Sequence, residues 1–149
     1  MDKEQALSKV SIFEKLNPKY TKGLAGICTE RTFMPGEHLM KQGESGIGLF
    51  IILSGKVKVE KSDTGGHPVE LAENGAGDIL GEMTVFDGAP RSASVIAVTE
   101  TVCLVLASWE FNAFLKAHPE AALELLPIVV ARFRQTNEAL VGLGSIKHG

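Results

Sequence analysis

The spacing of apolar and polar residues divides the chain into three parts, and the first part is helical. Its apolar residues recur at the intervals of one helix face, namely at Ala6, Leu7, Val10 and Phe13. This spacing predicts an amphipathic helix over residues 3–16, which Asn17-Pro18 would end. A shorter helix is expected over residues 19–27, although two glycines weaken it. Residues 3–28 are therefore predicted to form a helical N-terminus.

The second part, about residues 30–107, consists of short apolar or alternating runs between glycine-bearing turns. Residues 56–61 alternate between apolar and polar side chains, which predicts a strand with one buried and one exposed face. Residues 49–53 and 102–106 are continuously apolar, which predicts strands buried on both faces. Short strands separated by regularly spaced turns are typical of a β-sandwich or β-barrel. We therefore expect a β-roll over this region.

Helical spacing returns in the third part, about residues 108–142. Ser108 is the expected N-cap of one helix, and Pro119 suits the first turn of the next. The second helix carries an apolar stripe at Leu123, Leu126, Val130, Phe133 and Leu140. Pro127 lies within it and is expected either to kink the helix or to restart it. The 149 residues are therefore predicted to form a single domain that ends in helices.

Composition narrows the class of protein. Apolar residues make up 44% of the chain and charged residues 22%, as in ordinary globular domains. The net charge of −3 excludes a wholly basic protein that binds nucleic acid or membrane surfaces. We expect neither a membrane span nor a secretory signal, because no apolar run is long enough. Cys28 and Cys103 show no metal-binding or disulfide spacing, which favours a cytoplasmic protein.

One glycine-bearing segment in the β region has the chemistry of an anion site. Gly81 allows close backbone approach, and free amides at the start of a short helix can receive an anion. Arg91 adds a planar, permanent cation that suits phosphate, and Glu82 adds an acceptor for sugar hydroxyls. Ser92 and the Ala93 amide would complete the cradle. The segment therefore predicts a site for a nucleotide that presents both phosphate and ribose hydroxyls.

This segment resembles the phosphate-binding cassette of the cyclic nucleotide-binding domain family. It reads Gly81-Glu82-Met83-Thr84-Val85 and, after a short loop, Pro90-Arg91-Ser92-Ala93-Ser94-Val95. A second family motif resembles Gly43-Glu44-Ser45-Gly46, followed by the apolar run 49–53 and Gly55. The resemblance spans about residues 10–141. It implies a mainly β fold, an antiparallel jelly roll (double-stranded β-helix) with N-terminal helices and a long C-terminal helix.

The resemblance also implies roles for single residues. Glu82 would accept from the ribose 2′-hydroxyl, and Arg91 would pair with the cyclic phosphate. The C-terminal helix closes over the base in this family, and the candidates here include Arg132 and Phe133. Thr136-Asn137-Glu138 is similar to the segment by which bacterial members read adenine, which favours cyclic AMP. The implied ligand-binding residues are Gly81, Glu82, Met83, Thr84, Arg91, Ser92, Ala93, Thr136 and Asn137.

Two departures from the family pattern change the expectation. Thr84 stands where the family usually has Ala, Gly or Ser, so its methyl would narrow the pocket or its hydroxyl would help hold phosphate. No residues remain after the long helix for a helix-turn-helix domain, so DNA binding by this chain is not expected. We expect a stand-alone regulatory domain that needs no cofactor. It would signal by movement of the C-terminal helix, with a homodimer through that helix or a downstream effector as partner.

Several alternatives remain open from the sequence. One alternative is a family member that prefers cyclic GMP. Another is an interaction module that has the same fold but binds no nucleotide. In two further alternatives, Glu82 and Arg91 form only a structural ion pair, and Phe133 belongs to the core or to a dimer seam. A cupin-type metalloenzyme is disfavoured, because its clustered histidines are not found here. The four histidines are scattered along the chain at His38, His67, His118 and His148. We therefore expect no enzyme and no metal.

Overall fold

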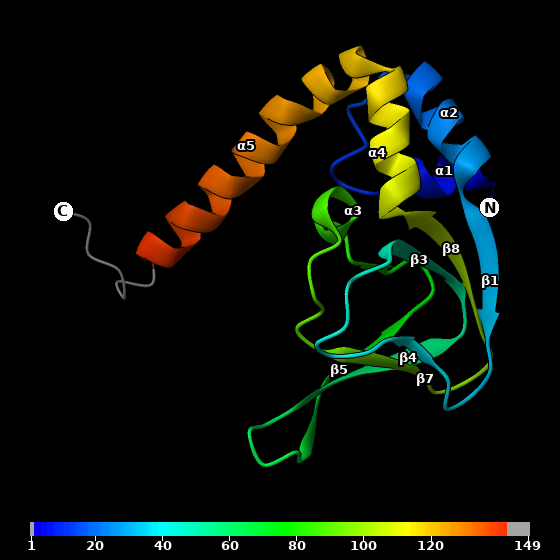
Figure 1. Cartoon of the computed structure of the whole chain (residues 1–149), viewed down its shortest axis with the longest axis vertical. Helices are drawn as coiled ribbons and strands as arrows, with labels where there is room; N and C mark the ends of the chain where they lie inside the picture. The colour runs from blue at the N-terminus through cyan, green and yellow to red at the C-terminus, as the bar shows by residue number, and fades with distance from the viewer. Residues whose placement is uncertain (1, 143–149) are drawn as a thin grey trace.

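The computed structural model describes residues 2–142 of the chain (Figure 1). Two helices come first, α1 (Lys3–Ser8) and α2 (Pro18–Ile27), and two come last, α4 (Ser108–Ala117) and α5 (Pro119–Gly142). A short helix, α3 (Thr84–Asp87), interrupts the strands. The strands are β1 (Thr29–Phe33), β2 (His38–Met40), β3 (Gly48–Ser54), β4 (Lys56–Ser62), β5 (Pro68–Gly75), β6 (Ile79–Leu80), β7 (Ser94–Ala97) and β8 (Thr101–Ala107).

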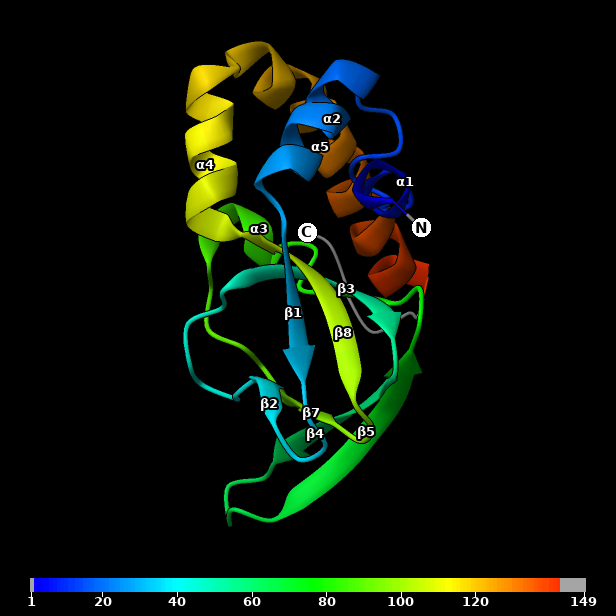
Figure 2. The same cartoon turned by 90° about the vertical axis from the view of Figure 1, so that its right-hand side faces the viewer.

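The strands form two antiparallel four-stranded sheets, ordered β1-β8-β3-β6 and β2-β7-β4-β5. Figure 2 shows β1, β8 and β3 side by side. The predicted jelly-roll class, with flanking helices and a long C-terminal helix, is confirmed. Figure 1 shows α1, α2 and α4 gathered at one end of the roll.

The two continuously apolar runs became β3 and β8, which pair with each other in the first sheet. One face of this pair, including Phe50 and Cys103, packs into the core between the sheets. The other face, including Ile51 and Leu104, packs against the helices. Because apolar groups cover both faces, alternation with polar residues would have left a polar side chain buried. Burial of both strands on both sides is thus confirmed.

The first predicted helix is wrong beyond Ser8. Residues 9–16 form successive turns, in which the amides of Val10, Phe13 and Leu16 donate to the carbonyls three residues back. The apolar residues of this segment are all buried, and they are Val10, Ile12, Phe13 and Leu16. Val10 and Ile12 are two residues apart and would point to nearly opposite sides of a helix, so a single helix face would not bury both. Asn17, expected to end that helix, instead caps α2 by accepting from the Lys19 amide at 3.1 Å.

For the C-terminal helices, one expectation needs correction and another is narrowed. Ser108 is not an N-cap, because β8 runs directly into α4 and Ala107 takes the cap position without a capping side chain. The Ser108 amide donates instead to the Ile47 carbonyl at 2.8 Å. Pro127 lies inside an unbroken α5, so the helix does not restart there. As expected, Pro119 opens α5. None of the helices in the described range is long and apolar enough to cross a membrane.

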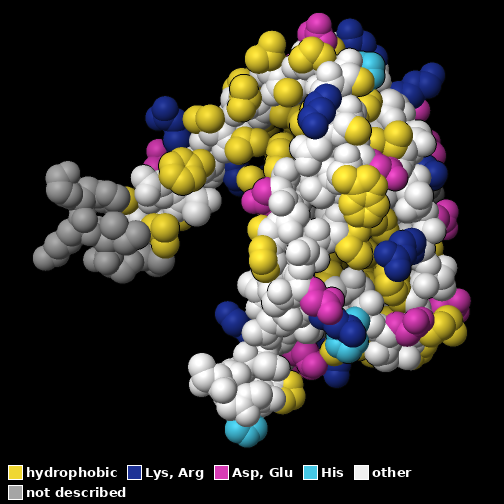
Figure 3. All heavy atoms as spheres, viewed as in Figure 1, with side chains coloured by type: hydrophobic (Ala, Val, Ile, Leu, Met, Phe, Trp, Pro, Cys, Tyr) yellow, Lys and Arg dark blue, Asp and Glu magenta, His cyan; other side chains and the backbone are white. Residues whose placement is uncertain are grey.

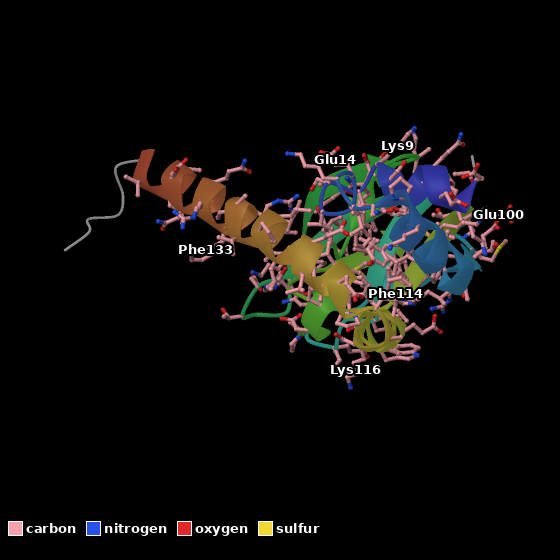
Figure 4. All side chains as sticks on the ribbon, turned by 90° about the horizontal axis from the view of Figure 1, so that it is seen from above. Lys9, Glu14, Glu100, Phe114, Lys116 and Phe133 are labelled. Atoms are coloured by element: carbon pink, nitrogen blue, oxygen red, sulfur yellow. The ribbon has the colours of Figure 1, made fainter. Side chains whose placement is uncertain are left out.

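Helix α5 has two opposite faces. Ala121 and Leu125 are buried against the rest of the domain. The opposite face carries exposed apolar side chains, which we call the α5 stripe: Leu123, Leu126, Val130, Phe133 and Leu140. Figures 1 and 3 show the second half of the helix running away from the roll with apolar atoms along it. Phe133, labelled in Figure 4, is 72% exposed and lies on this extended part.

Candidate functional site

A cavity of about 250 Å³ opens beside the predicted cassette. Strands β4, β6 and β7, helix α3 and the loop between α3 and β7 contribute to its wall. The lining residues are Val59, Leu80, Thr84, Pro90, Arg91, Ser92, Ala93 and Val95. A larger hollow of about 450 Å³ lies beneath α1, but Lys9 is the one charged residue in its otherwise apolar or small lining. The cassette cavity is therefore the better candidate for a phosphate-bearing ligand.

Glycines let the cassette lie against the start of β3. Gly81 has φ +75°, and a Cβ there would run into the Gly48 carbonyl and come within 2.7 Å of Arg91 Nη1. A Cβ at Gly46 would collide with the Thr84 side chain. The Gly46 amide also donates to the carbonyls of Gly88 and Ala89, both at 3.1 Å. The two sequence motifs are therefore in contact, although nearly forty residues separate them along the chain.

Arg91 is a half-buried cation held by neutral groups. Its Nη1 donates to the Thr84 hydroxyl at 2.9 Å, which connects the two halves of the cassette. Its backbone amide donates to the Glu44 carbonyl, and its carbonyl accepts from Gly43, both at 2.9 Å. Burial lowers the pKa of the Arg91 guanidinium, and no ion pair to it occurs in the described part of the chain. A structural ion pair between Glu82 and Arg91 is thus not formed.

Backbone amides around the cavity are available to a ligand. Those of Met83, Thr84 and Ala93 donate no hydrogen bond within residues 2–142. Ser92 lies exposed on the cavity wall. Unpaired amides beside a fixed cation can form a cradle for an anion, since each amide offers a hydrogen-bond donor. The structure thus brings together the groups from which the sequence predicts an anion site.

Glu82 does not line this cavity in the present conformation. Its Oε1 accepts from the Ser11 hydroxyl at 2.6 Å, the Ile12 amide at 3.1 Å and Arg132 Nη2 at 3.0 Å. Sequence reasoning missed Ser11 and Ile12 as partners. They lie about seventy positions away in the chain, and no local pattern marks them.

The residues expected to read the base lie away from the cavity. Thr136 and Asn137 are both exposed on α5. The Thr136 hydroxyl donates to the Arg132 carbonyl one turn back, at 3.1 Å. The structure therefore brings Gly81, Thr84, Arg91, Ser92 and Ala93 together, with Met83 beside them, but leaves the two α5 residues outside.

The described residues hold no group of three or more side chains suited to a metal ion. His38 lies in β2, His67 in the turn before β5 and His118 between α4 and α5. His148 falls outside the described residues. Cys28 and Cys103 are free and buried, and burial raises their pKa values to about 12 and about 11. Neither thiol carries the lowered pKa of a reactive cysteine.

Comparison with known proteins points in the same direction. The profile of the family described as "Cyclic nucleotide-binding domain" matches residues 30–118. A "CRP-like cAMP-activated global transcriptional regulator" of Mycobacterium tuberculosis is 29% identical over 94% of this chain and 62% of its own length. A "Cyclic nucleotide-gated potassium channel" of Rhizobium etli is 36% identical over 79% of this chain and 32% of the channel.

A solved structure has a similar fold. The N-terminal domain of a transcriptional regulator from Streptomyces coelicolor A3(2) matches with a TM-score of 0.81 and 32% identity. This match covers 91% of the present chain and 94% of that domain. The chain spans about three fifths of the length of the Mycobacterium regulator.

Proposed function

The chain belongs to the cyclic nucleotide-binding domain family, and we propose that it is a regulatory domain that binds cyclic AMP in the Arg91 cavity. Relatives named as a cAMP-activated regulator and a cyclic nucleotide-gated channel support a regulatory rather than an enzymatic role. The observation that carries the proposal is Arg91, a half-buried guanidinium without an anionic partner in the described part of the chain. Burying a cation is costly unless a charge of opposite sign arrives, and a cyclic phosphate supplies that charge.

Each cassette residue then has a role. Arg91 pairs with the cyclic phosphate, and the Thr84 hydroxyl holds the guanidinium in place before the ligand arrives. Ser92 and the amides of Met83, Thr84 and Ala93 donate to the remaining phosphate oxygens. Gly81 has no side chain, so the backbone can lie close to Gly48 and room is left for the Arg91 guanidinium.

Signalling involves α5, because its residues reach the base only if the helix moves. Thr136 and Asn137 are the residues we assign to adenine recognition, and both are exposed in the present conformation. Binding would draw this half of α5 towards the cavity and change its contacts with a partner.

The α5 stripe supports a second copy of this chain as that partner. Its residues follow intervals of three and four, as in a coiled coil, and Asn137 occupies the one gap in the series. In the nucleotide-free dimer, an Asn at such a core position favours a parallel pair in one register, because the two amides can hydrogen-bond across the axis. We propose a homodimer through α5. A downstream effector that covers the same stripe is the other candidate.

A thermal-shift titration tests the ligand. The purified chain is heated with cyclic AMP, cyclic GMP, cyclic di-GMP or 5′-AMP. A ligand at about 100 times its dissociation constant adds about 2.7 kcal/mol, which for this size raises Tm by roughly 5–11 °C. We expect that rise with cyclic AMP and none with 5′-AMP. A rise with cyclic GMP alone would change the base preference, and no shift, with no nucleotide co-purifying, would favour the nucleotide-free interaction module.

A further inference from the structure

The hollow of about 450 Å³ beneath α1, which we call the α1 hollow, is separate from the cassette cavity. Its lining comes from α1 and the residue after it, from β3 and β6, and from the turn between β5 and β6. The lining residues are Ala6, Lys9, Ile51, Ile52, Leu53, Ala76, Gly77 and Ile79. Ile79 packs with the cluster that faces the helices, whereas the next residue, Leu80, lines the cassette cavity and packs between the sheets. Because neighbouring residues of a strand point to opposite faces, β6 lies between the two cavities.

The α1 hollow has an apolar closed end and an exposed mouth. Ala6 and Ile51 are buried at the closed end. Ala76, Gly77 and Lys9 are exposed, so the hollow opens between the end of α1 and the turn between β5 and β6. The space remains because Ala6 is the one residue of α1 in the lining, and its methyl group does not fill it. Protein cores contain few voids larger than a water molecule, so an apolar space of this size is a candidate ligand site.

The mouth of the α1 hollow carries a positive charge. Lys9, labelled in Figure 4, follows the last residue of α1 and is the one charged residue in the lining. Its ammonium forms no ion pair within residues 2–142. Asp78, the one carboxylate of the turn between β5 and β6, lies outside the lining, and its Oδ2 accepts from the Gly75 amide at 2.9 Å and the Asn74 side chain at 3.1 Å. The mouth therefore presents an unpaired cation at the edge of an apolar space.

We propose that the α1 hollow binds a single-chain amphiphile with one negative charge, namely a medium-chain fatty acid. The alkyl chain would lie against Ala6 and Ile51, because an apolar wall cannot satisfy a polar group. The carboxylate would pair with the Lys9 ammonium at the mouth. Each buried methylene tightens binding about fourfold, whereas an exposed ion pair contributes at most about fivefold. The chain would therefore supply most of the affinity, and Lys9 would select an anion. This inference does not depend on nucleotide binding in the Arg91 cavity.

Titration calorimetry with octanoate, decanoate and decanol, each below its micelle concentration, tests both parts of the site. Decanoate should bind about 15-fold more tightly than octanoate, since two further methylenes are buried. Lys9→Met should weaken decanoate binding about two- to fivefold and leave decanol binding unchanged. Lys22→Met is the matched control, because Lys22 is exposed on α2 outside the lining, and it should bind as the wild type does. No binding of decanoate, or the same affinity change for decanoate and decanol in Lys9→Met, would overturn the proposal.

A variant at the mouth and methyl NMR locate the bound chain. Ala76→Trp places a large side chain at the mouth, on an exposed turn, and should abolish decanoate binding without lowering Tm in ligand-free unfolding. Methyl NMR of the wild type gives an answer even if that variant does not fold. Decanoate should shift the methyl signals of Ile51 and Ile79 and leave that of Ile96, on β7, in place. Shifts that spare both lining residues would refute the assignment.

Two further variants separate the α1 hollow from other surfaces that could hold an amphiphile. Arg91→Met removes the cation of the cassette cavity, and Phe133→Ser removes the most exposed side chain of the α5 stripe. Both should bind decanoate as the wild type does, and loss of binding in either would place the ligand there and overturn the proposal. Lys9-dependent binding to phosphatidylglycerol vesicles, without binding of decanoate, would make Lys9 part of a membrane contact and would refute it as well.

Discussion

Arg91 offers a test in which ligand binding and protein stability are expected to respond differently. Arg91→Met removes the guanidinium but keeps most of the apolar stem. A charge-assisted contact to phosphate contributes about 1.5–3 kcal/mol, which corresponds to a roughly 10- to 150-fold rise in the dissociation constant. We expect cyclic AMP binding to weaken by at least this factor, because the guanidinium is the one cation in the cavity lining.

Stability of the empty protein should hardly change. The variant loses the hydrogen bond from Arg91 to Thr84, a contribution of about 1 kcal/mol. It also removes a half-buried charge that burial disfavours, as the lowered pKa of Arg91 indicates. The two effects have opposite sign, so the free energy of unfolding should stay within about 1 kcal/mol of the wild type. For a domain of this length that is a Tm change of less than about 4 °C.

Calorimetric titration with cyclic AMP and ligand-free thermal unfolding measure the two quantities. Arg31→Met serves as the matched control, since Arg31 is exposed on β1 and stacks over Phe33, outside the cavity lining. A destabilisation of Arg91→Met by more than about 2 kcal/mol would show that the guanidinium is a structural group. Unchanged affinity would refute the assignment of the binding site.

Three further predictions concern stability and assembly. Gly81→Ala should destabilise the fold by about 2 kcal/mol or more in chemical denaturation, because its φ is +75° and a Cβ would strike the Gly48 carbonyl. Cys28 and Cys103 have folded pKa values above the unfolded value of 9.0, so they stay protonated while the unfolded thiols ionise. The contribution of these thiols to the free energy of unfolding should therefore be fully present below about pH 9. Above that pH it should fall by up to about 1.4 kcal/mol per pH unit per thiol, and a Cys103→Ala variant should show a shallower fall. Phe133→Ser should shift α5-mediated dimers towards monomers in sedimentation velocity, and an unchanged mass would point to a different interface.

The parts of the fold that sequence could predict are those set by local chemistry. The apolar runs of β3 and β8 indicated burial on both faces, and the two core clusters confirm it. Gly81 was expected to allow a close backbone approach, and its contacts with Gly48 and Arg91 show where the approach occurs. In both cases the physical cause lies in a few residues that are close together in the sequence.

The parts that sequence could not predict depend on distant contacts. Residues 9–16 showed helical spacing at Val10 and Phe13, but burial of Ile12 as well requires turns. The partners of Glu82 come from segments 50 to 71 positions away, so only the folded chain shows them. The exit direction of α5 is likewise set by packing of Ala121 and Leu125 against the domain.

The strand order has a consequence for how the domain is made in the cell. β8 is the last strand to leave the ribosome, yet it lies between β1 and β3 in the first sheet. β1 therefore cannot pair, through Thr29 opposite Val105, until β8 has been synthesised. The longest strand pairing of β3, also with β8, forms only then. Such non-local pairing gives a high contact order and folding on the millisecond-to-second scale. The nascent chain should stay sensitive to proteolysis until β8 has emerged, and the roll should then form in one cooperative step.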